Sequence, residues 1–303
     1  MRQTVDVVIP VYQPDEKYAR LLKGLAGQTY PVEHIYVMNT GEAYYRASEY
    51  PAPENITVKH LTTAEFDHGG TRDRAARMGS SDLVLFLTQD AVPADRNLVE
   101  NLVRCFADPQ VGAAYARQLP APDCGAIERY TRQFNYPPES RKKTKADLEE
   151  LGIKTYFCSN VCAMYRREVY QELGGFPVKT IFNEDMIFAA SVIQSGRAVV
   201  YAADARVVHS HNYSGLQQFH RNFDMAVSQA DHPEIFAGLK SEGEGMRLVK
   251  KTAGWLLGHK PWLLPQLIWV SGWKYFGYLL GKRYRKLPKK AVLWCSMNSR
   301  YWK

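Results

Sequence analysis

The sequence lacks the features that mark several classes of protein. Its five cysteines, at positions 105, 124, 158, 162 and 295, form no C-x-x-C pair and no zinc-finger spacing, which is typical of free thiols in a reducing compartment. The N-terminus lacks the long apolar run and cleavage site of a secretory signal peptide. Nothing in the composition is of low complexity, and 46% hydrophobic with 23% charged residues describes a folded chain. We therefore expect a globular cytoplasmic protein.

Acidic residues are scarce near the end of the chain. Residues 240–303 hold 14 basic and 2 acidic residues, whereas residues 1–239 hold 25 basic and 29 acidic ones. A basic tail indicates an anionic partner, either nucleic acid or the acidic leaflet of a membrane. The sequence contains no recognised nucleic-acid-binding module, so we expect no nucleic-acid partner and favour the membrane surface.

The tail also lacks an uninterrupted apolar run of the length that crosses a bilayer. Residues 261–281 are rich in tryptophan, tyrosine and leucine but are interrupted by Pro265, Gln266, Ser271 and Lys274. About 20 apolar residues are needed to span a membrane. We therefore expect this segment to lie in the membrane interface, where aromatic and basic side chains are favoured. A buried pair of helices packed on the rest of the chain is the alternative.

Apolar runs alternate with helical patterns over the first 117 residues. Strands are expected at 5–11, 35–38, 56–61, 83–87 and 111–117. The helices expected between them are 16–28, 71–78 and 95–106. This order predicts an α/β fold that binds its ligand at the carboxyl ends of the strands. After an irregular stretch at 120–152, further strands are expected at 156–165, 198–201 and 205–208, with helices at 183–194 and 215–230.

Polar or glycine-rich residues follow the first four of these strands. Gly69 and Gly70 open a helix near Arg72, and free backbone N–H groups there can bind an anion, although an ordinary turn is the alternative. Asp90 directly follows an apolar strand, where a carboxylate can hold a divalent cation against a diphosphate. A turn or helix-start aspartate is the alternative for Asp90.

Two further clusters of polar residues lie in the second half. Glu184 and Asp185 begin a helix, where acidic residues also serve as caps that the helix dipole favours. His209 and His211 take alternate positions at the end of a strand and so point to one face. Either can complete the coordination of an ion held by Asp90, and a pair of ordinary hydrogen-bonded histidines is the alternative.

Taken together, these pieces resemble the nucleotide-sugar glycosyltransferases of family 2, and among them the bacterial rhamnosyltransferases. The resemblance rests on VVIPVY, EFDHGGTRDRA, FLTQDAVP, RQLPAP, FNYPPES, FCSNVCAMYRR, LGGFP, NEDMIFAA and VVHSHNYS, in this order. It implies a GT-A fold, a Rossmann-like mixed sheet flanked by helices. The catalytic domain would span 1–230, with a nucleotide-binding half at 1–117 and an acceptor-binding half at 118–230. A helical, membrane-associating extension would follow at 231–303.

The resemblance also implies a role for each site residue. TQD stands where the family usually has Asp-x-Asp, so Asp90 is expected to hold Mg²⁺ or Mn²⁺, with His209 and His211 as further candidate ligands. Asp185 is implied as the general base, ionised and weakly basic at its helix start, with Glu184 beside it. Asn160 and Glu184 are expected to bind the acceptor. The residues expected to bind the nucleotide sugar are Pro10, Tyr12, Asn39, Asp67, Gly70, Arg72, Gln89 and Asp90.

From this resemblance we expect an inverting, metal-dependent enzyme on the inner face of the bacterial plasma membrane. It would transfer L-rhamnose from dTDP-β-L-rhamnose to a lipid-linked or oligosaccharide acceptor in cell-surface polysaccharide synthesis. A UDP-hexose or UDP-N-acetylhexosamine donor is one alternative, and a noncatalytic membrane-bound subunit is another. The sequence is compatible with an oligomer.

Overall fold

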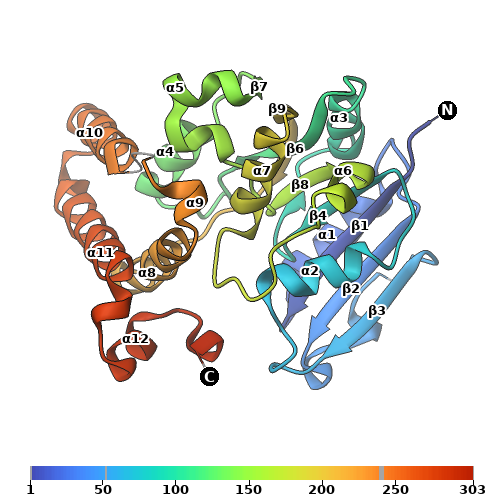
Figure 1. Cartoon of the computed structure of the whole chain (residues 1–303), viewed down its shortest axis with the longest axis horizontal. Helices are drawn as coiled ribbons and strands as arrows, with labels where there is room; N and C mark the ends of the chain where they lie inside the picture. The colour runs from blue at the N-terminus through green and yellow to red at the C-terminus, as the bar shows by residue number, and fades with distance from the viewer. Residues whose placement is uncertain (1, 52, 239–241, 303) are drawn as a thin grey trace. The chain divides into compact units, whose positions relative to one another are not determined.

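The computed structural model describes residues 2–51, 53–238 and 242–302, and its strands form one mixed sheet of nine strands (Figure 1). The spatial order is β3-β2-β1-β4-β8-β6-β9-β5, and β7 pairs with β9. The strands are β1 (Val5–Tyr12), β2 (His34–Thr40), β3 (Ile56–Leu61), β4 (Leu83–Leu87), β5 (Val92–Pro93), β6 (Val111–Leu119), β7 (Arg141–Lys143), β8 (Cys162–Arg166) and β9 (Ala198–Val208).

The centre of the sheet is apolar on both faces. β1 lies between β2 and β4 and is parallel to both. Every residue of β4 is buried, and so are six of the eight residues of β1.

 In β1, residues 5–9 and Val11 are buried, Pro10 is half-buried and Tyr12 is exposed. Continuous apolar runs of this kind are typical of parallel strands covered on both faces. The mixed α/β sheet expected from the sequence is therefore confirmed.

Helices alternate with these strands along the chain, and further helices follow the last strand. In chain order the α-helices are α1 (Glu16–Ala26), α2 (His68–Ala76), α3 (Leu98–Cys105), α4 (Ala126–Asn135), α5 (Leu148–Leu151), α6 (Arg167–Glu172), α7 (Glu184–Gln194), α8 (Gly215–Asp231), α9 (Pro233–Phe236), α10 (Glu242–His259), α11 (Leu264–Lys282) and α12 (Lys289–Cys295). Asp67 caps α2, so this helix begins three residues before the predicted position 71.

Three segments differ from the sequence-based expectation. β9 is one continuous strand where two were predicted, because it pairs with β6 along most of its length across a bulge near Ala116. β8 begins only at Cys162, after a 3₁₀ helix at Gly152–Tyr156. The stretch 120–152 contains α4 and β7, and β7 is a strand because it pairs with β9.

The described chain divides into two compact units that alternate along the sequence. The first unit draws on residues 1–121, 136–178 and 184–209 and contains the whole sheet. The second draws on 122–135, 179–183 and 210–303 and contains α4 and α8–α12. The predicted division at residue 230 into a catalytic domain and an extension stays a prediction, and residues 239–241 of that extension lie outside the described part.

The second unit is built around the packing of α8 against α11 (Figure 1). Two glycines of α11 allow the backbones to approach closely. A Cβ atom on Gly277 would lie 2.2 Å from the carbonyl oxygen of Phe219, and one on Gly281 would lie 2.3 Å from that of Phe223. Among the described helices, none is both long enough and apolar enough to cross a membrane.

Candidate active site

The carboxyl ends of β2 and β4 and the helix α2 carry buried polar atoms that have no hydrogen-bond partner within the described residues. These atoms are Asn39 Oδ1, Thr40 Oγ1, Arg72 Nε and Thr88 Oγ1. A buried polar group without a partner costs about 1–3 kcal/mol. Such groups are expected to be satisfied by a ligand, so they mark this edge of the sheet as a binding site for a polar molecule.

Asn39 presents an acceptor there. Its Nδ2 lies 3.2 Å from the carbonyl oxygen of Gly41 and 2.9 Å from Nδ1 of His60, which is its partner residue on β3. The amide nitrogen is therefore occupied, and Oδ1 remains to accept a hydrogen bond from a ligand N–H or O–H group.

Gln89 joins the ends of β1 and β4. Its Oε1 accepts a hydrogen bond from the backbone nitrogen of Tyr12 at 2.7 Å, and its Nε2 donates to the Tyr12 carbonyl at 3.0 Å. The Tyr12 ring is 43% exposed and meets the ring of Tyr44 edge-on, with 5.9 Å between centroids. Gln89 thus holds the main chain of Tyr12, whose ring meets that of Tyr44. The donor-binding roles of Gln89, Tyr12 and Pro10 stay predictions.

The start of α2 differs from the expected row of free N–H groups. Asp67 Oδ1 accepts the Gly70 N–H at 2.6 Å, so this amide is already used in capping the helix. Gly69 is required by packing, because a Cβ there would lie 2.0 Å from the carbonyl oxygen of Pro177. Arg72 is buried and donates to the carbonyl oxygen of His68 at 2.8 Å. The donor-binding roles of Asp67, Gly70 and Arg72 stay predictions.

Asp90 and His209 meet at the ends of β4 and β9. Asp90 Oδ2 lies 3.5 Å from His209 Nε2, and His209 Nδ1 lies 3.0 Å from Gln118 Oε1. The amide nitrogen of Gln118 donates to Tyr136 and Ser159, so its oxygen is the acceptor and His209 Nδ1 carries the hydrogen. The lone pair of His209 is then on Nε2, the nitrogen nearer Asp90, as a metal-binding histidine requires.

The predicted metal ligands fit a divalent cation. One ligand atom from each of Asp90, His209 and His211 lies within 4.8 Å of the other two. A carboxylate with two imidazoles is a mixed oxygen and nitrogen donor set, and imidazole nitrogen suits a transition-metal ion such as Mn²⁺ better than it suits Mg²⁺. The assignment of these three residues to a metal stays a prediction.

The two predicted catalytic carboxylates occupy different environments although they are adjacent. Glu184 is buried, and its Oε1 lies 3.3 Å from Arg72 Nη1 and 3.3 Å from Asn160 Nδ2. Asp185 is half-buried, and it accepts hydrogen bonds from the backbone nitrogens of Asn160 at 2.9 Å and Met186 at 2.8 Å. Asn160 therefore contacts both carboxylates.

These environments move the two pKa values in opposite directions. Burial acts to raise the pKa of Glu184, but the charges of Arg72 and His68 outweigh it and the pKa is lowered. Burial, and then the charge on Glu184, raise the pKa of Asp185. The expectation that the helix start keeps Asp185 ionised at neutral pH and weakly basic is therefore corrected, because the loss of solvent and the neighbouring carboxylate raise its pKa by more than the helix start lowers it.

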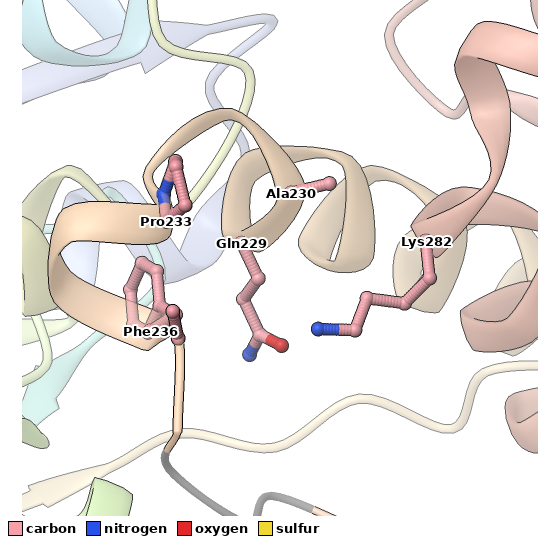
Figure 2. Close-up of a pocket in the computed structure, with 6 residues that line it drawn as sticks. Gln229, Ala230, Pro233, Phe236 and Lys282 are labelled. Carbon is pink, nitrogen blue, oxygen red and sulfur yellow. The ribbon is translucent and has the colours of Figure 1, made fainter.

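A pocket in the second unit contains none of these residues. It has a volume of about 260 Å³ and is lined by Gln229, Ala230, Pro233, Phe236, Ala237 and Lys282 (Figure 2). The side chains of Lys282 and Gln229 extend toward each other in it, and Gln229 also accepts a hydrogen bond from Tyr278 at 3.1 Å. It offers no carboxylate and no metal ligand, so it is not a candidate catalytic centre.

Residues 6–174 match the model of the family described as glycosyl transferase family 2. The chain belongs to this family. It is accordingly an enzyme that transfers a sugar, as the resemblance implied. Its relatives include the O-antigen chain rhamnosyltransferase RfbN of Salmonella typhimurium, 39% identical over 98% of this chain and 96% of the relative. The O-antigen chain rhamnosyltransferase WbaN of Salmonella anatum is 44% identical over 82% of this chain and 79% of the relative.

Solved structures show the same fold at low sequence identity. A mannosyltransferase of Pyrobaculum calidifontis, in complex with GDP-Man and Mn²⁺, has a TM-score of 0.56 and 18% identity over 100% of this chain and 83% of its own. Residues 1–349 of TarS of S. aureus, in complex with UDP-GlcNAc, have a TM-score of 0.53 and 14% identity over 93% and 92%. The GT-A fold expected from the sequence is confirmed.

Three residues that the sequence did not single out contribute to this site. Gln118 orients His209, His60 occupies the amide nitrogen of Asn39, and Tyr165 bonds to Asn160. Gln118 lies in RQLPAP and Tyr165 in FCSNVCAMYRR, but the two motifs by themselves assign no role to these side chains. The contact of His60 with Asn39 can be recognised only from the pairing of β2 with β3.

Proposed function

We propose that the chain is an inverting rhamnosyltransferase that uses dTDP-β-L-rhamnose and builds a cell-surface polysaccharide. Two relatives at 39% and 44% identity carry the name O-antigen chain rhamnosyltransferase, which supports the sugar and the pathway class. The structural observation that carries the proposal is the pairing of Glu184 with Arg72. This pair leaves Asp185 as the neighbouring carboxylate that can take up a proton.

The proposed reaction assigns the proton to Asp185. The acceptor oxygen forms a bond to the anomeric carbon of rhamnose while its proton passes to the Asp185 carboxylate. The bond between that carbon and the diphosphate oxygen breaks, and its electron pair leaves with dTDP. Attack from the face opposite the diphosphate inverts the anomeric centre. A base whose pKa is raised toward the working pH is well matched to this transfer.

The nucleotide would lie at the carboxyl ends of β2 and β4. The unpaired acceptor on Asn39 suits the N–H of a thymine or uracil ring, and the exposed Tyr12 ring offers a surface for stacking. Asp90, His209 and His211 would hold the cation. When bound, a divalent cation would neutralise charge on the departing diphosphate.

We propose further that the acceptor is lipid-linked and that the second unit binds the inner face of the plasma membrane. α11 exposes large apolar side chains along one side while Gly277 and Gly281 pack on α8. The exposed fractions are 71% for Ile268, 63% for Trp269, 57% for Tyr275 and 53% for Phe276.

Two exposed tryptophans and a set of basic residues lie near α11 in the sequence. Trp262 is 70% exposed and Trp294 is 61% exposed. The rings of Phe276 and Trp294 both contact Phe219, at 5.8 and 5.7 Å between centroids, so α11 and α12 contribute to one aromatic surface. The exposed basic residues that follow are Lys282, Arg283, Arg285, Lys286, Lys289 and Lys290. Aromatic and basic side chains together favour an anionic membrane interface.

Donor hydrolysis by the purified full chain tests the proposal. The panel contains dTDP-rhamnose, UDP-glucose and UDP-N-acetylglucosamine, each with Mg²⁺, with Mn²⁺ or with EDTA. We expect metal-dependent release of dTDP from dTDP-rhamnose. The Asp185→Asn variant is the control and should bind dTDP while turnover falls by about 10²–10⁴-fold. Turnover of UDP-sugars alone would overturn the rhamnosyl assignment. Full activity in EDTA would overturn the proposed metal dependence.

A further inference from the structure

A chain of buried hydrogen bonds ends at the carboxylate pair. The hydroxyl of Tyr165 donates to Asn160 Oδ1 at 2.9 Å, and Cys158 Sγ lies 3.4 Å from the same hydroxyl. Asn160 Nδ2 then donates to Glu184 at 3.3 Å, and its backbone nitrogen donates to Asp185 at 2.9 Å. Because the hydroxyl proton of Tyr165 is used on Asn160, the Cys158 thiol is the donor at the other end. All the donors therefore point toward the carboxylates.

The position of Tyr165 is held by the core of the first unit. Its side chain is fully buried on β8, and its ring packs edge-on against Phe86, Phe176 and Phe188 with centroids 5.5–5.6 Å away. An amide side chain can place either its oxygen or its nitrogen in a given direction. A hydroxyl that donates to Oδ1 of Asn160 forces the N–H₂ group to face Glu184. The reversed amide would place an oxygen against a carboxylate oxygen.

We propose that Tyr165 is a positioning residue that acts through Asn160 to keep Glu184 as the charged member of the pair and Asp185 as the member that exchanges a proton. The inference rests on the proposed function, in which Asp185 receives the acceptor proton. Tyr165 itself touches neither carboxylate by hydrogen bond and contacts no substrate in this scheme.

The charged and titratable groups around the pair set the direction of the expected change. Besides the two carboxylates of α7, they are Arg72 and His68 from α2, Cys158 from the turn before β8, and Tyr165 from β8. Removing the Tyr165 hydroxyl leaves Asn160 Oδ1 without this donor, so the Asn160 amide is held less firmly and its hydrogen bond to Glu184 weakens. The doubly ionised pair becomes less favourable, so the last proton should leave at a higher pH.

The test compares Tyr165→Phe with Tyr170→Phe in the full chain. Tyr170 is also buried, but its hydroxyl donates to Asp73 and not to Asn160, so the same atom is removed away from the pair. For Tyr165→Phe we expect the acid limb of the kcat profile to move up by about 0.5 pH unit or more, with the KM for the donor changed less than twofold. Tyr170→Phe should leave the limb in place.

An infrared titration reads the same pair without sugar transfer. The protonated-carboxyl signal that disappears in Asp185→Asn is followed against pH in the wild type and in both tyrosine variants. A shift to higher pH in Tyr165→Phe alone supports the positioning role even when no donor in the panel is turned over. An unchanged titration in folded Tyr165→Phe, or equal shifts in both variants, would overturn it.

Discussion

At the scale of single residues, the site depends on adjacent groups being made chemically different. Glu184 and Asp185 are neighbours in the sequence, yet one is paired with Arg72 and the other lies beside the resulting negative charge. The sequence predicted the pair and its helix start, but the partners of each carboxylate come from α2 and from the turn before β8. The direction of the hydrogen bonds that Gln118 and Asn160 make could not be predicted from the sequence either, because it depends on contacts between distant segments.

The raised pKa of Asp185 has a consequence for stability. The folded protein holds the Asp185 proton more strongly than the unfolded chain, whose aspartate has a pKa near 3.9. The wild type should therefore lose stability relative to Asp185→Asn as pH rises above about 5 through the raised pKa. Thermal unfolding of both proteins between pH 5 and 9 measures this difference.

Asp82 provides a control of opposite sign for this measurement. Hydrogen bonds from Thr4 lower the pKa of Asp82, so its contribution to stability is fully present above the unfolded pKa and is lost only in more acidic solution. The difference between wild type and Asp82→Asn should thus stay constant from pH 5 to 9. A constant difference for Asp185→Asn over the same range would contradict the raised pKa.

At the scale of secondary-structure elements, the strands that the sequence predicts best are the most hydrophobic ones. The apolar runs that form β1 and β4 are buried on both sides and were predicted close to their observed bounds. β7 consists of Arg141, Lys142 and Lys143, which show no strand pattern. It forms a strand because β9 offers a free edge, and pairing between segments more than fifty residues apart leaves no local signal.

The glycines of α11 allow a prediction about the packing of this helix on α8. Gly277→Ala should destabilise the second unit by about 1–3 kcal/mol, because the added Cβ would meet the backbone of Phe219. Gly272→Ala on the same helix meets nothing within 4 Å and should stabilise it by about 0.5–1 kcal/mol through helix propensity. Chemical denaturation of the two variants measures both effects. Equal effects of the two substitutions would show that close packing of α11 on α8 does not contribute to stability.

At the scale of the whole molecule, charge is distributed unevenly along the chain. The 14 basic and 2 acidic residues of 240–303 contrast with the acidic excess of residues 1–239. The sequence alone predicted this contrast and the aromatic segment beside it. It did not predict which side of α11 is exposed, because the packing of α11 on α8 decides which residues remain available.

Membrane binding should accordingly depend on the basic residues of the second unit. Lys289→Ala with Lys290→Ala should weaken binding to vesicles containing anionic phospholipid by about 30-fold, at about 1 kcal/mol for each charge. Lys59→Ala with Lys145→Ala removes the same charge from exposed positions of the first unit and should have little effect. Cosedimentation with vesicles at two salt concentrations measures this. Equal losses for both pairs, or binding insensitive to salt, would contradict the proposed surface.

The alternation of the two units along the sequence determines the order in which the enzyme can assemble during translation. α4 packs against α10, where the rings of Tyr130 and Trp255 lie 5.2 Å apart, yet more than a hundred residues separate these helices. At about 5–20 residues per second, α4 leaves the ribosome roughly 5–25 s before α10. Its apolar side must stay uncovered, or be held by a chaperone, throughout that interval. A nascent chain that stops after β9 would therefore expose α4 and should be a target for proteases.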